Sequence, residues 1–91
     1  MAIDVNSKEF KDALKTVLIG LGYDAGDDVS LRKYKGIENP TDDQVAMWQA
    51  YGLFNALQDI SQDIDMADSF VIAINDYINE NGGWDYIPND D

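Results

Sequence analysis

Apolar residues recur at intervals of three and four along three long segments of this chain, residues 5–22, 40–60 and 61–83. This spacing places them on one face of an α-helix, whereas a half-buried strand would alternate apolar and polar residues. No segment shows that alternation. A chain of 91 residues has room for one hydrophobic core. The pattern therefore predicts an all-α fold, a small bundle of three long helices in a single domain over residues 1–91.

Capping residues mark both ends of the first helix. Asn6 is the predicted N-cap because Glu9 follows it at the spacing of a capping box. Gly22 is predicted to stop the helix. The expected core face consists of Phe10, Ala13, Leu14, Val17, Leu18 and Leu21.

Residues 27–36 predict either a short extra helix or an irregular loop. In the helical interpretation, Asp27 or Asp28 caps the start and Gly36 closes the end. Residues 32–35 include the last three basic side chains of the chain. Three bases are too few for direct binding of nucleic acid by so acidic a chain, and their expected role is to neutralise part of the acidic half, residues 36–91.

The second long helix, over residues 40–60, begins with Thr41 and Gln44 at capping-box spacing. Its expected core face consists of Val45, Leu53, Ala56, Leu57 and Ile60. Trp48 and Tyr51 fall on the polar side instead, together with Asn55. Gly52 is expected to permit a close approach of another helix.

The third helix lies within residues 61–83, with Asp63 or Asp65 as the expected cap and the pair Gly82–Gly83 as its end. Its expected apolar stripe consists of Met66, Phe70, Ala73, Ile74, Tyr77 and Ile78. The opposite, polar face holds Asp65, Asp68, Asp76, Asn79 and Glu80, together with Ser69 and Ile72.

The tail after the third helix contains large apolar side chains. We expect it to fold back through Trp84 or Tyr86, with a flexible end at residues 88–91.

Charge is distributed very unevenly along the chain. Residues 1–35 carry six acids and six bases, whereas residues 36–91 carry twelve acids and no Lys, Arg or His. Like charges on neighbouring helical turns repel by a few tenths of a kcal/mol each, on the order measured in helical peptides. Stability alone would therefore favour scattered Lys residues. A binding function that excludes positive charge is one explanation, and indifference to charge at a solvated surface is the other.

The composition excludes several functions. The chain has no Cys and no His, so thiolate metal sites, cysteine nucleophiles and the usual general base are absent. We therefore expect a binding protein rather than an enzyme, with no metal and no cofactor. No apolar run approaches the roughly 18 residues of a membrane span and no secretion signal precedes the first helix, so the expected location is cytoplasmic.

Acidic residues gather on the polar face of the third helix and in the turn before it. Their positions are Asp59, Asp63, Asp65, Asp68, Asp76 and Glu80. From Asp65 to Glu80 the helix rises about 22 Å, so its carboxylates would form a row of negative charge, as phosphates do along a nucleic acid. This acidic stripe predicts a partner with a basic surface, such as a nucleic-acid-binding enzyme. The alternative is a solvated face that serves only solubility.

Trp48, Tyr51 and Asn55 form a second candidate, an aromatic patch on the polar side of the second helix. Exposed Trp and Tyr are common interface anchors, and a homodimer would use the same surface. Alternatively, the tail or the segment before the helix covers both rings and makes them part of the core. An exposed patch would favour a structural or assembly protein, the second functional hypothesis.

In size and charge the chain is similar in type to small acidic phage proteins that block restriction, CRISPR or DNA-repair enzymes by imitating DNA. This resemblance concerns character only, since no signature residues are shared. It implies inhibition of a nucleic-acid enzyme through occupation of its basic groove.

Overall fold

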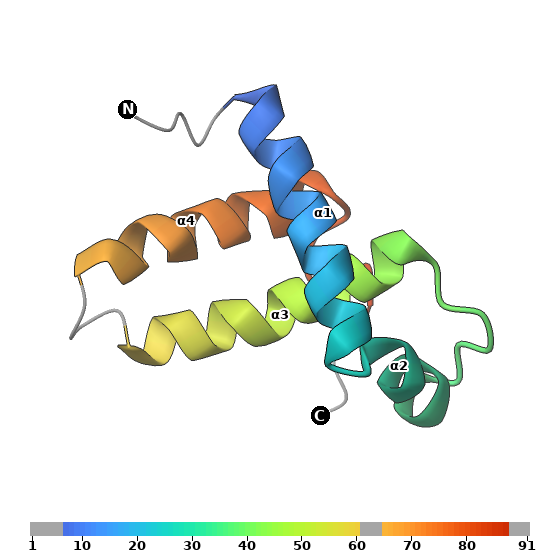
Figure 1. Cartoon of the computed structure of the whole chain (residues 1–91). Coiled ribbons are helices and arrows are strands. Elements are labelled where there is room, and N and C mark those ends of the chain that lie inside the picture. The colour runs from blue at the N-terminus through green and yellow to red at the C-terminus, as the bar shows by residue number, and fades with distance from the viewer. Residues whose placement is uncertain (1–6, 61–64, 88–91) are drawn as a thin grey trace. The chain divides into compact units, whose positions relative to one another are not determined.

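The computed structural model describes residues 7–60 and 65–87, except for the side chains of residues 60 and 65–68. Four helices follow one another: α1 (Lys8–Asp24), α2 (Asp27–Lys35), α3 (Asp42–Ile60) and α4 (Asp65–Glu80), as Figure 1 shows. No strand occurs within the described ranges. The prediction of an all-helical chain is therefore confirmed. The chain divides into two compact units, Met1–Gln49 and Ala50–Asp91, which we describe separately.

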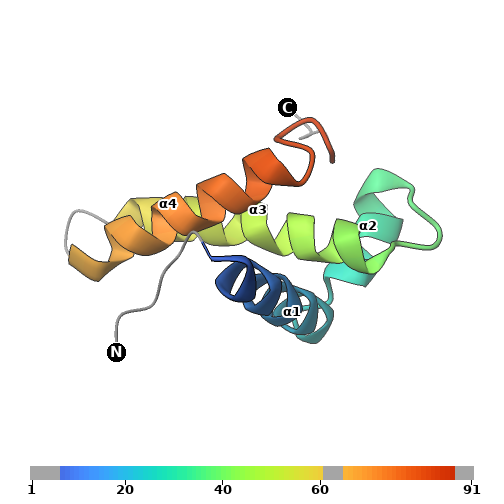
Figure 2. The same ribbon diagram turned by 90° about the horizontal axis from the view of Figure 1, so that it is seen from above.

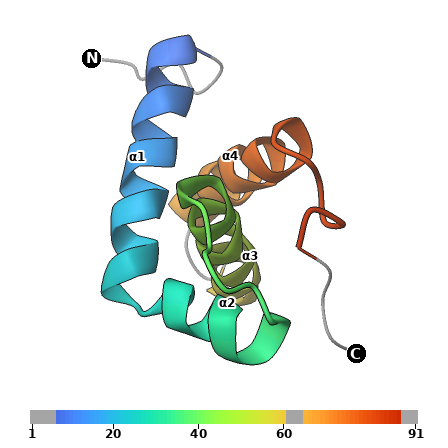
Figure 3. The same ribbon diagram turned by 90° about the vertical axis from the view of Figure 1, so that its right-hand side faces the viewer.

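In the first unit, α1 begins one residue later than its predicted cap. The hydroxyl oxygen of Ser7 accepts a hydrogen bond from the amide of Phe10 at 3.1 Å, so Ser7 is the N-cap and the prediction of Asn6 was wrong. The helix also continues through Gly22 to Asp24. The chain then turns at Ala25 and Gly26, which has a φ of 79°, and enters α2 (Figure 3).

Gly22 is a packing residue rather than a helix stop. It is buried, and a Cβ atom at this position would lie 2.5 Å from Val45 Cγ1 and 3.1 Å from the Val45 carbonyl oxygen. The start of α3 therefore approaches the backbone of α1 more closely than any side chain at position 22 would allow. Gly52, the predicted site of close approach, has nothing within 4 Å of its Cβ position.

The expected core face of α1 is largely wrong. Of its six predicted members only Leu18 is buried, while Ala13, Val17 and Leu21 are exposed. The buried apolar side chains of the first unit come instead from all three of its helices: Leu18, Leu31, Val45, Ala46 and Met47. A helical pattern identifies a possible apolar face, but how much of that face is buried depends on the neighbouring elements.

The short helix α2 resolves the alternative left by the sequence. It is helical over Asp27–Lys35, and Gly36, with a φ of 69°, ends it as predicted. Its N-cap is Gly26, which offers no side-chain hydrogen bond, so neither Asp27 nor Asp28 is the cap. The next helix, α3, begins with the predicted capping box: the amide of Gln44 donates to Thr41 Oγ1, and the amide of Thr41 donates to Gln44 Oε1.

In the second unit, α4 runs antiparallel to the second half of α3 (Figure 1). Its predicted stripe is buried at Ala73, Ile74, Tyr77 and Ile78, but Phe70 is exposed. The side chain of Met66 and the predicted cap Asp63 lie outside the described residues.

The predicted end of α4 at two glycines is confirmed. The Gly83 amide donates to the Ile78 carbonyl at 2.7 Å, and Gly82 and Gly83 have φ values of 123° and 76°. This is a Schellman-type end, which requires a residue with positive φ just after the helix. The turn reverses the chain, as Figure 2 shows.

After that turn the tail packs onto α3, as expected for Trp84. Its ring stacks on Tyr51 with centroids 4.7 Å apart and meets the edge of Phe54 at 5.2 Å. Tyr86 is exposed, whereas Ile87 is buried. The expected flexible end, residues 88–91, lies outside the described residues.

Candidate protein-binding surface

The acidic stripe is described in part. Asp59 lies near the end of α3, while Asp76 and Glu80 lie on α4, and all three are exposed. Asp65 and Asp68 belong to α4, but their side chains are not among those described, and Asp63 lies outside the described residues. Asp76 and Glu80 are one turn apart on the same helix face, where side chains at this spacing are neighbours.

The second unit has no cation of its own to pair with these acids. Residues 50–91 contain nine Asp and Glu residues and no Lys, Arg or His. No ion pair can therefore form among the side chains of this unit. Asp85, in the tail, is also exposed. The unit consequently presents negative charge on α3, on α4 and in the tail.

Tyr51, the centre of the predicted aromatic patch, is buried and is only 4% exposed. Its hydroxyl donates a hydrogen bond to the Gly83 carbonyl at 2.8 Å and accepts one from the Ile87 amide at 3.3 Å. Burial raises the pKa of this hydroxyl above its ordinary value, although the Ile87 amide opposes the shift. Of the two interpretations, coverage by the tail is therefore correct for Tyr51.

The other two members of the patch differ from Tyr51. Asn55 is exposed on α3. Trp48 is half-buried, and the Nζ atom of Lys35 lies 5.3 Å from the centroid of its ring. Through this cation–π contact the last residue of α2 interacts with α3 within the first unit. Because Tyr51 is buried, it is not accessible to a partner as an anchor of the aromatic patch.

The first unit pairs many of its charges internally. Lys15 Nζ of α1 lies 2.6 Å from Asp43 Oδ1 of α3, and the Tyr23 hydroxyl donates to Asp42 Oδ1 at 2.7 Å. The hydrogen bond to Asp42 raises the pKa of Tyr23. Within α2, Arg32 lies 3.3 Å from Asp28. Asp28 belongs to residues 1–35, so this pair does not test the expectation that the bases of residues 32–35 neutralise part of the acidic half.

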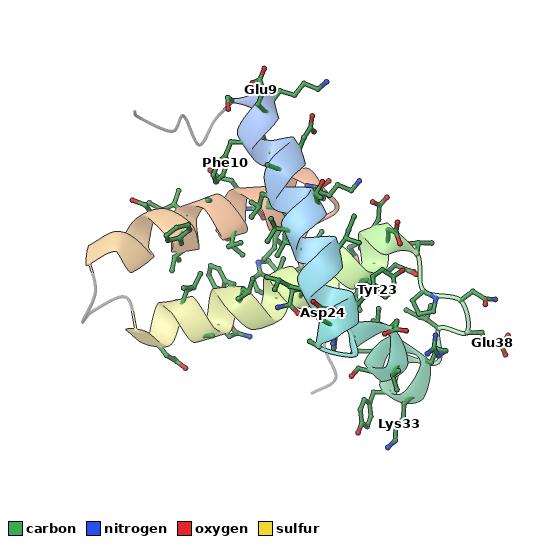
Figure 4. All side chains as sticks on the ribbon, viewed as in Figure 1. Glu9, Phe10, Tyr23, Asp24, Lys33 and Glu38 are labelled. Atoms are coloured by element: carbon green, nitrogen blue, oxygen red, sulfur yellow. The ribbon has the colours of Figure 1, made fainter. Side chains whose placement is uncertain are left out.

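Figure 4 shows how the labelled side chains of this unit are arranged. Lys33 extends from α2 into solvent, and its Nζ atom lies 5.4 Å from the centroid of the neighbouring Tyr34 ring. Glu38 is exposed on the loop between α2 and α3. The first unit thus exposes charges of both signs, whereas residues 50–91 contain no cation.

Asp27 is the one buried polar group without a partner in the described part of the chain. Its Oδ2 atom has no hydrogen-bond donor and lies 3.2 Å from the Cβ position of Gly22. Burial, with a smaller contribution from the neighbouring Asp28 carboxylate, raises the pKa of Asp27 to about 6. The residue is half-buried, and burial disfavours its charged form relative to a fully solvated carboxyl.

Two kinds of site were sought in the described residues without result. No cluster of three or more potential metal ligands occurs among them. None of the described helices combines the length and the apolar character that crossing a membrane requires.

Comparisons with known proteins found no matching family model, no matching curated protein and no matching solved structure. The function must therefore be inferred from the chain itself.

One exposed side chain was not selected from the sequence. Ile72 lies on the polar face of α4 and is exposed, although it is a large apolar residue. Its position among polar residues is visible in the sequence, where an exposed aliphatic residue is a weaker sign of an interface than Trp or Tyr.

Proposed function

We propose that this chain is an acidic protein-binding module that inhibits a nucleic-acid-binding enzyme by occupying its basic groove in place of DNA or RNA. The acids of residues 50–91 provide the contact, so the chain itself neither binds nucleic acid nor catalyses a reaction. A cytoplasmic location and a bundle-like arrangement of the four helices belong to the same proposal.

The observation that carries the proposal is the one-signed charge of the second unit. Residues 50–91 have nine acids and no base, and the described carboxylates Asp59, Asp76, Glu80 and Asp85 are all exposed. A purely structural surface would gain from a few Lys residues, as the ion pairs of the first unit illustrate. An exposed surface of one sign instead favours rapid association with a surface of the opposite sign.

The mechanism is electrostatic competition. A nucleic-acid groove holds Lys and Arg side chains that release counterions when phosphates bind. Carboxylates on α4 can occupy the same cations, and the affinity should then fall steeply as salt increases. The helix fixes the backbone spacing of Asp76 and Glu80, which favours binding because no backbone freedom has to be lost there.

The first experiment is affinity capture from lysate with the immobilised chain, followed by a salt gradient and competition with DNA. A captured enzyme that DNA displaces is then purified, and its affinity is measured for two variants of equal charge. The first variant combines Asp59→Asn, Asp76→Asn and Glu80→Gln in the second unit. The control combines the exposed Glu9→Gln, Asp24→Asn and Glu38→Gln in the first unit.

The two variants separate local from overall charge because both remove three negative charges. We expect the second-unit variant to bind at least about tenfold more weakly at low salt, with a smaller change for the control. Equal weakening in both would mean that only net charge matters. Unchanged affinity in the second-unit variant would refute the assignment of the acidic stripe.

A structural or assembly role is the second candidate, and the exposed apolar side chains of α1 favour it. Val17 and Leu21 are one turn apart and are 52% and 43% exposed. An assembly protein would self-associate in a salt-tolerant manner, which sedimentation at high and low salt would detect. Val17→Asp should abolish such association, whereas the charge variants should not.

A further inference from the structure

Ile72 is the most exposed large hydrophobic side chain in the described part of the second unit. It is 57% exposed, compared with 49% for Phe70 and 42% for Tyr86. Residues three, four and seven positions away on a helix share one face. For Ile72 the neighbours with described side chains are Ser69, Asn75, Asp76 and Asn79; Asn75 is half-buried and the other three are exposed.

This position does not contribute to the core of the unit. The buried residues of α4 are Ala73, Ile74, Tyr77 and Ile78, which lie on the other side of the helix. Phe70 is also exposed, but two positions correspond to about 200° around a helix, so Phe70 and Ile72 face different directions. Ile72 therefore provides the apolar centre of the polar face.

We propose that Ile72 is the apolar anchor of a binding surface on α4, and that the occupant is a cationic segment of a partner protein with an apolar side chain among its Lys and Arg residues. The inference rests on the proposed function. It adds that water is excluded around Ile72 and that the partner must contribute an apolar side chain as well as cations.

Charge complementarity selects this occupant. A second copy that met this face with its own α4 would bring another unit with nine acids and no base against it. Nucleic acids and anionic lipid surfaces would be repelled in the same way. A cationic protein segment is attracted, and an apolar residue within it can meet Ile72 while its Lys or Arg side chains reach Asp76.

The arrangement matches the usual anatomy of a protein interface, in which an apolar centre is surrounded by polar residues. Asp76 follows Ile72 by one helical turn, which places their Cβ atoms roughly 5–6 Å apart. Burial of Ile72 would remove water from this carboxylate and strengthen its attraction for a cation. The aromatic anchor expected from the sequence, Tyr51, is unavailable because the tail covers it.

The test uses two synthetic helical peptides as probes. One contains Lys and Leu with the Leu residues on one face, and in the other every Leu is replaced by Ala. Binding to the full chain is measured by calorimetry at low salt for the wild type, for Ile72→Ala and for Val29→Ala. Val29 on α2 is a matched control, since it is β-branched and 52% exposed.

We expect the Leu peptide to bind the wild type more tightly than the Ala peptide, and Ile72→Ala to weaken the Leu peptide by about fivefold. The Ala peptide should be little affected, and Val29→Ala should change neither. Circular dichroism of Ile72→Ala should be native, because the side chain is exposed.

The outcomes separate the two proposals. Equal, salt-sensitive binding of both peptides, unchanged in Ile72→Ala, would overturn the anchor and leave the acidic surface standing. Equal weakening by Val29→Ala and Ile72→Ala would also overturn the anchor. Failure of both peptides to bind at low salt would count against the proposed function, and the anchor would fall with it.

Discussion

Residues 1–49 and 50–91 each carry nine acids, but the first unit also holds all six basic side chains of the chain and the second holds none. The first unit joins its helices with polar contacts, such as Lys15–Asp43 and the Tyr23–Asp42 hydrogen bond. The second unit joins its elements through the stacked rings of Tyr51 and Trp84 and through backbone groups.

This difference shows what remains available when a unit contains no cations. Tyr51 supplies one donor and one acceptor to the tail backbone, so its burial leaves the hydroxyl satisfied. None of the exposed carboxylates of the second unit can serve an ion pair within that unit. The described contacts of this unit are therefore aromatic packing and backbone hydrogen bonds, and its described carboxylates are exposed.

The largest expected effect tests the aromatic side of this comparison. Trp84→Ala removes the ring that contacts both Tyr51 and Phe54, so we expect the free energy of unfolding of the second unit to fall by about 2–3 kcal/mol. Amide hydrogen exchange along α4 and the tail measures this loss of stability in the second unit alone. The control Tyr34→Ala, at a 64% exposed ring in the first unit, should cost less than about 0.5 kcal/mol.

If Trp84→Ala left the amide hydrogen-exchange protection of the second unit unchanged, the proposed difference between the two units would be wrong. Aromatic stacking would then be incidental to its stability, and other contacts would have to hold the tail.

The next effect belongs to the close approach in the first unit. In Gly22→Ala the new methyl group would meet Val45 at its side chain and its carbonyl oxygen, so we expect a loss of about 1–3 kcal/mol even after the gain in helix propensity. Gly20→Ala is the matched control on the same helix, because nothing lies within 4 Å of its Cβ position. It should stabilise the protein by up to about 1 kcal/mol. Urea unfolding of both variants provides the measurement.

Equal stabilisation by the two substitutions would show that α1 and α3 do not require this approach. The first unit would then depend mainly on its polar contacts.

Local signals in the sequence predicted most of the helices. The Thr41–Gln44 capping box, the stop at Gly82–Gly83 and the buried half of the α4 stripe were all predicted correctly. These features depend on residues within one or two turns, and the corresponding hydrogen bonds form wherever the helix is placed.

Features that depend on neighbours could not be obtained in this way. Gly22 and Gly52 look alike in sequence, yet Gly22 meets Val45 of α3 and Gly52 meets nothing. Similarly, the sequence left open whether Tyr51 is exposed or covered by the tail, and the contacts that decide this come from Gly83 and Ile87, more than thirty residues away. The charge of the candidate site was predictable from composition, and the polar-face position of Ile72 was predictable from helical spacing, but the exposed fraction of its side chain required the fold.

A smaller effect concerns the buried carboxyl of the first unit. The pKa of Asp27 is raised to about 6 in the folded chain from an ordinary value of 3.8, chiefly by burial. The folded chain therefore binds the Asp27 proton more tightly than the unfolded chain does. The stability that this proton provides is fully present below about pH 4 and is lost as pH rises through about 6. Because the group is partly solvated, we expect this loss to amount to about 1 kcal/mol.

Asp27→Asn removes the titration, so the slope of stability between about pH 4 and pH 6 should become flatter than in the wild type. Asp24→Asn at the exposed end of α1 is the control and should keep the wild-type slope. Thermal unfolding across this pH range measures both. Identical slopes in Asp27→Asn and the wild type would mean that the carboxyl is hydrated in the folded chain.

The smallest effect is the most direct test of the comparison, because salt should act on the two units in opposite directions. Screening weakens the exposed Lys15–Asp43 and Arg32–Asp28 pairs of the first unit, whereas in the second unit it relieves repulsion among acids that have no cation of their own. Between about 0.05 and 0.5 M NaCl we expect amide protection along α4 to rise, and protection in α1 and α2 to fall, by a few tenths of a kcal/mol each. Sucrose is a suitable control, since its exclusion from the surface stabilises both units without screening charge. A rise of equal size in both units would show that the net charge of the whole chain governs stability, and that the different charges of residues 1–49 and 50–91 do not. Repulsion among the acids of the second unit would then not destabilise that unit in particular, and a basic partner would relieve no such repulsion.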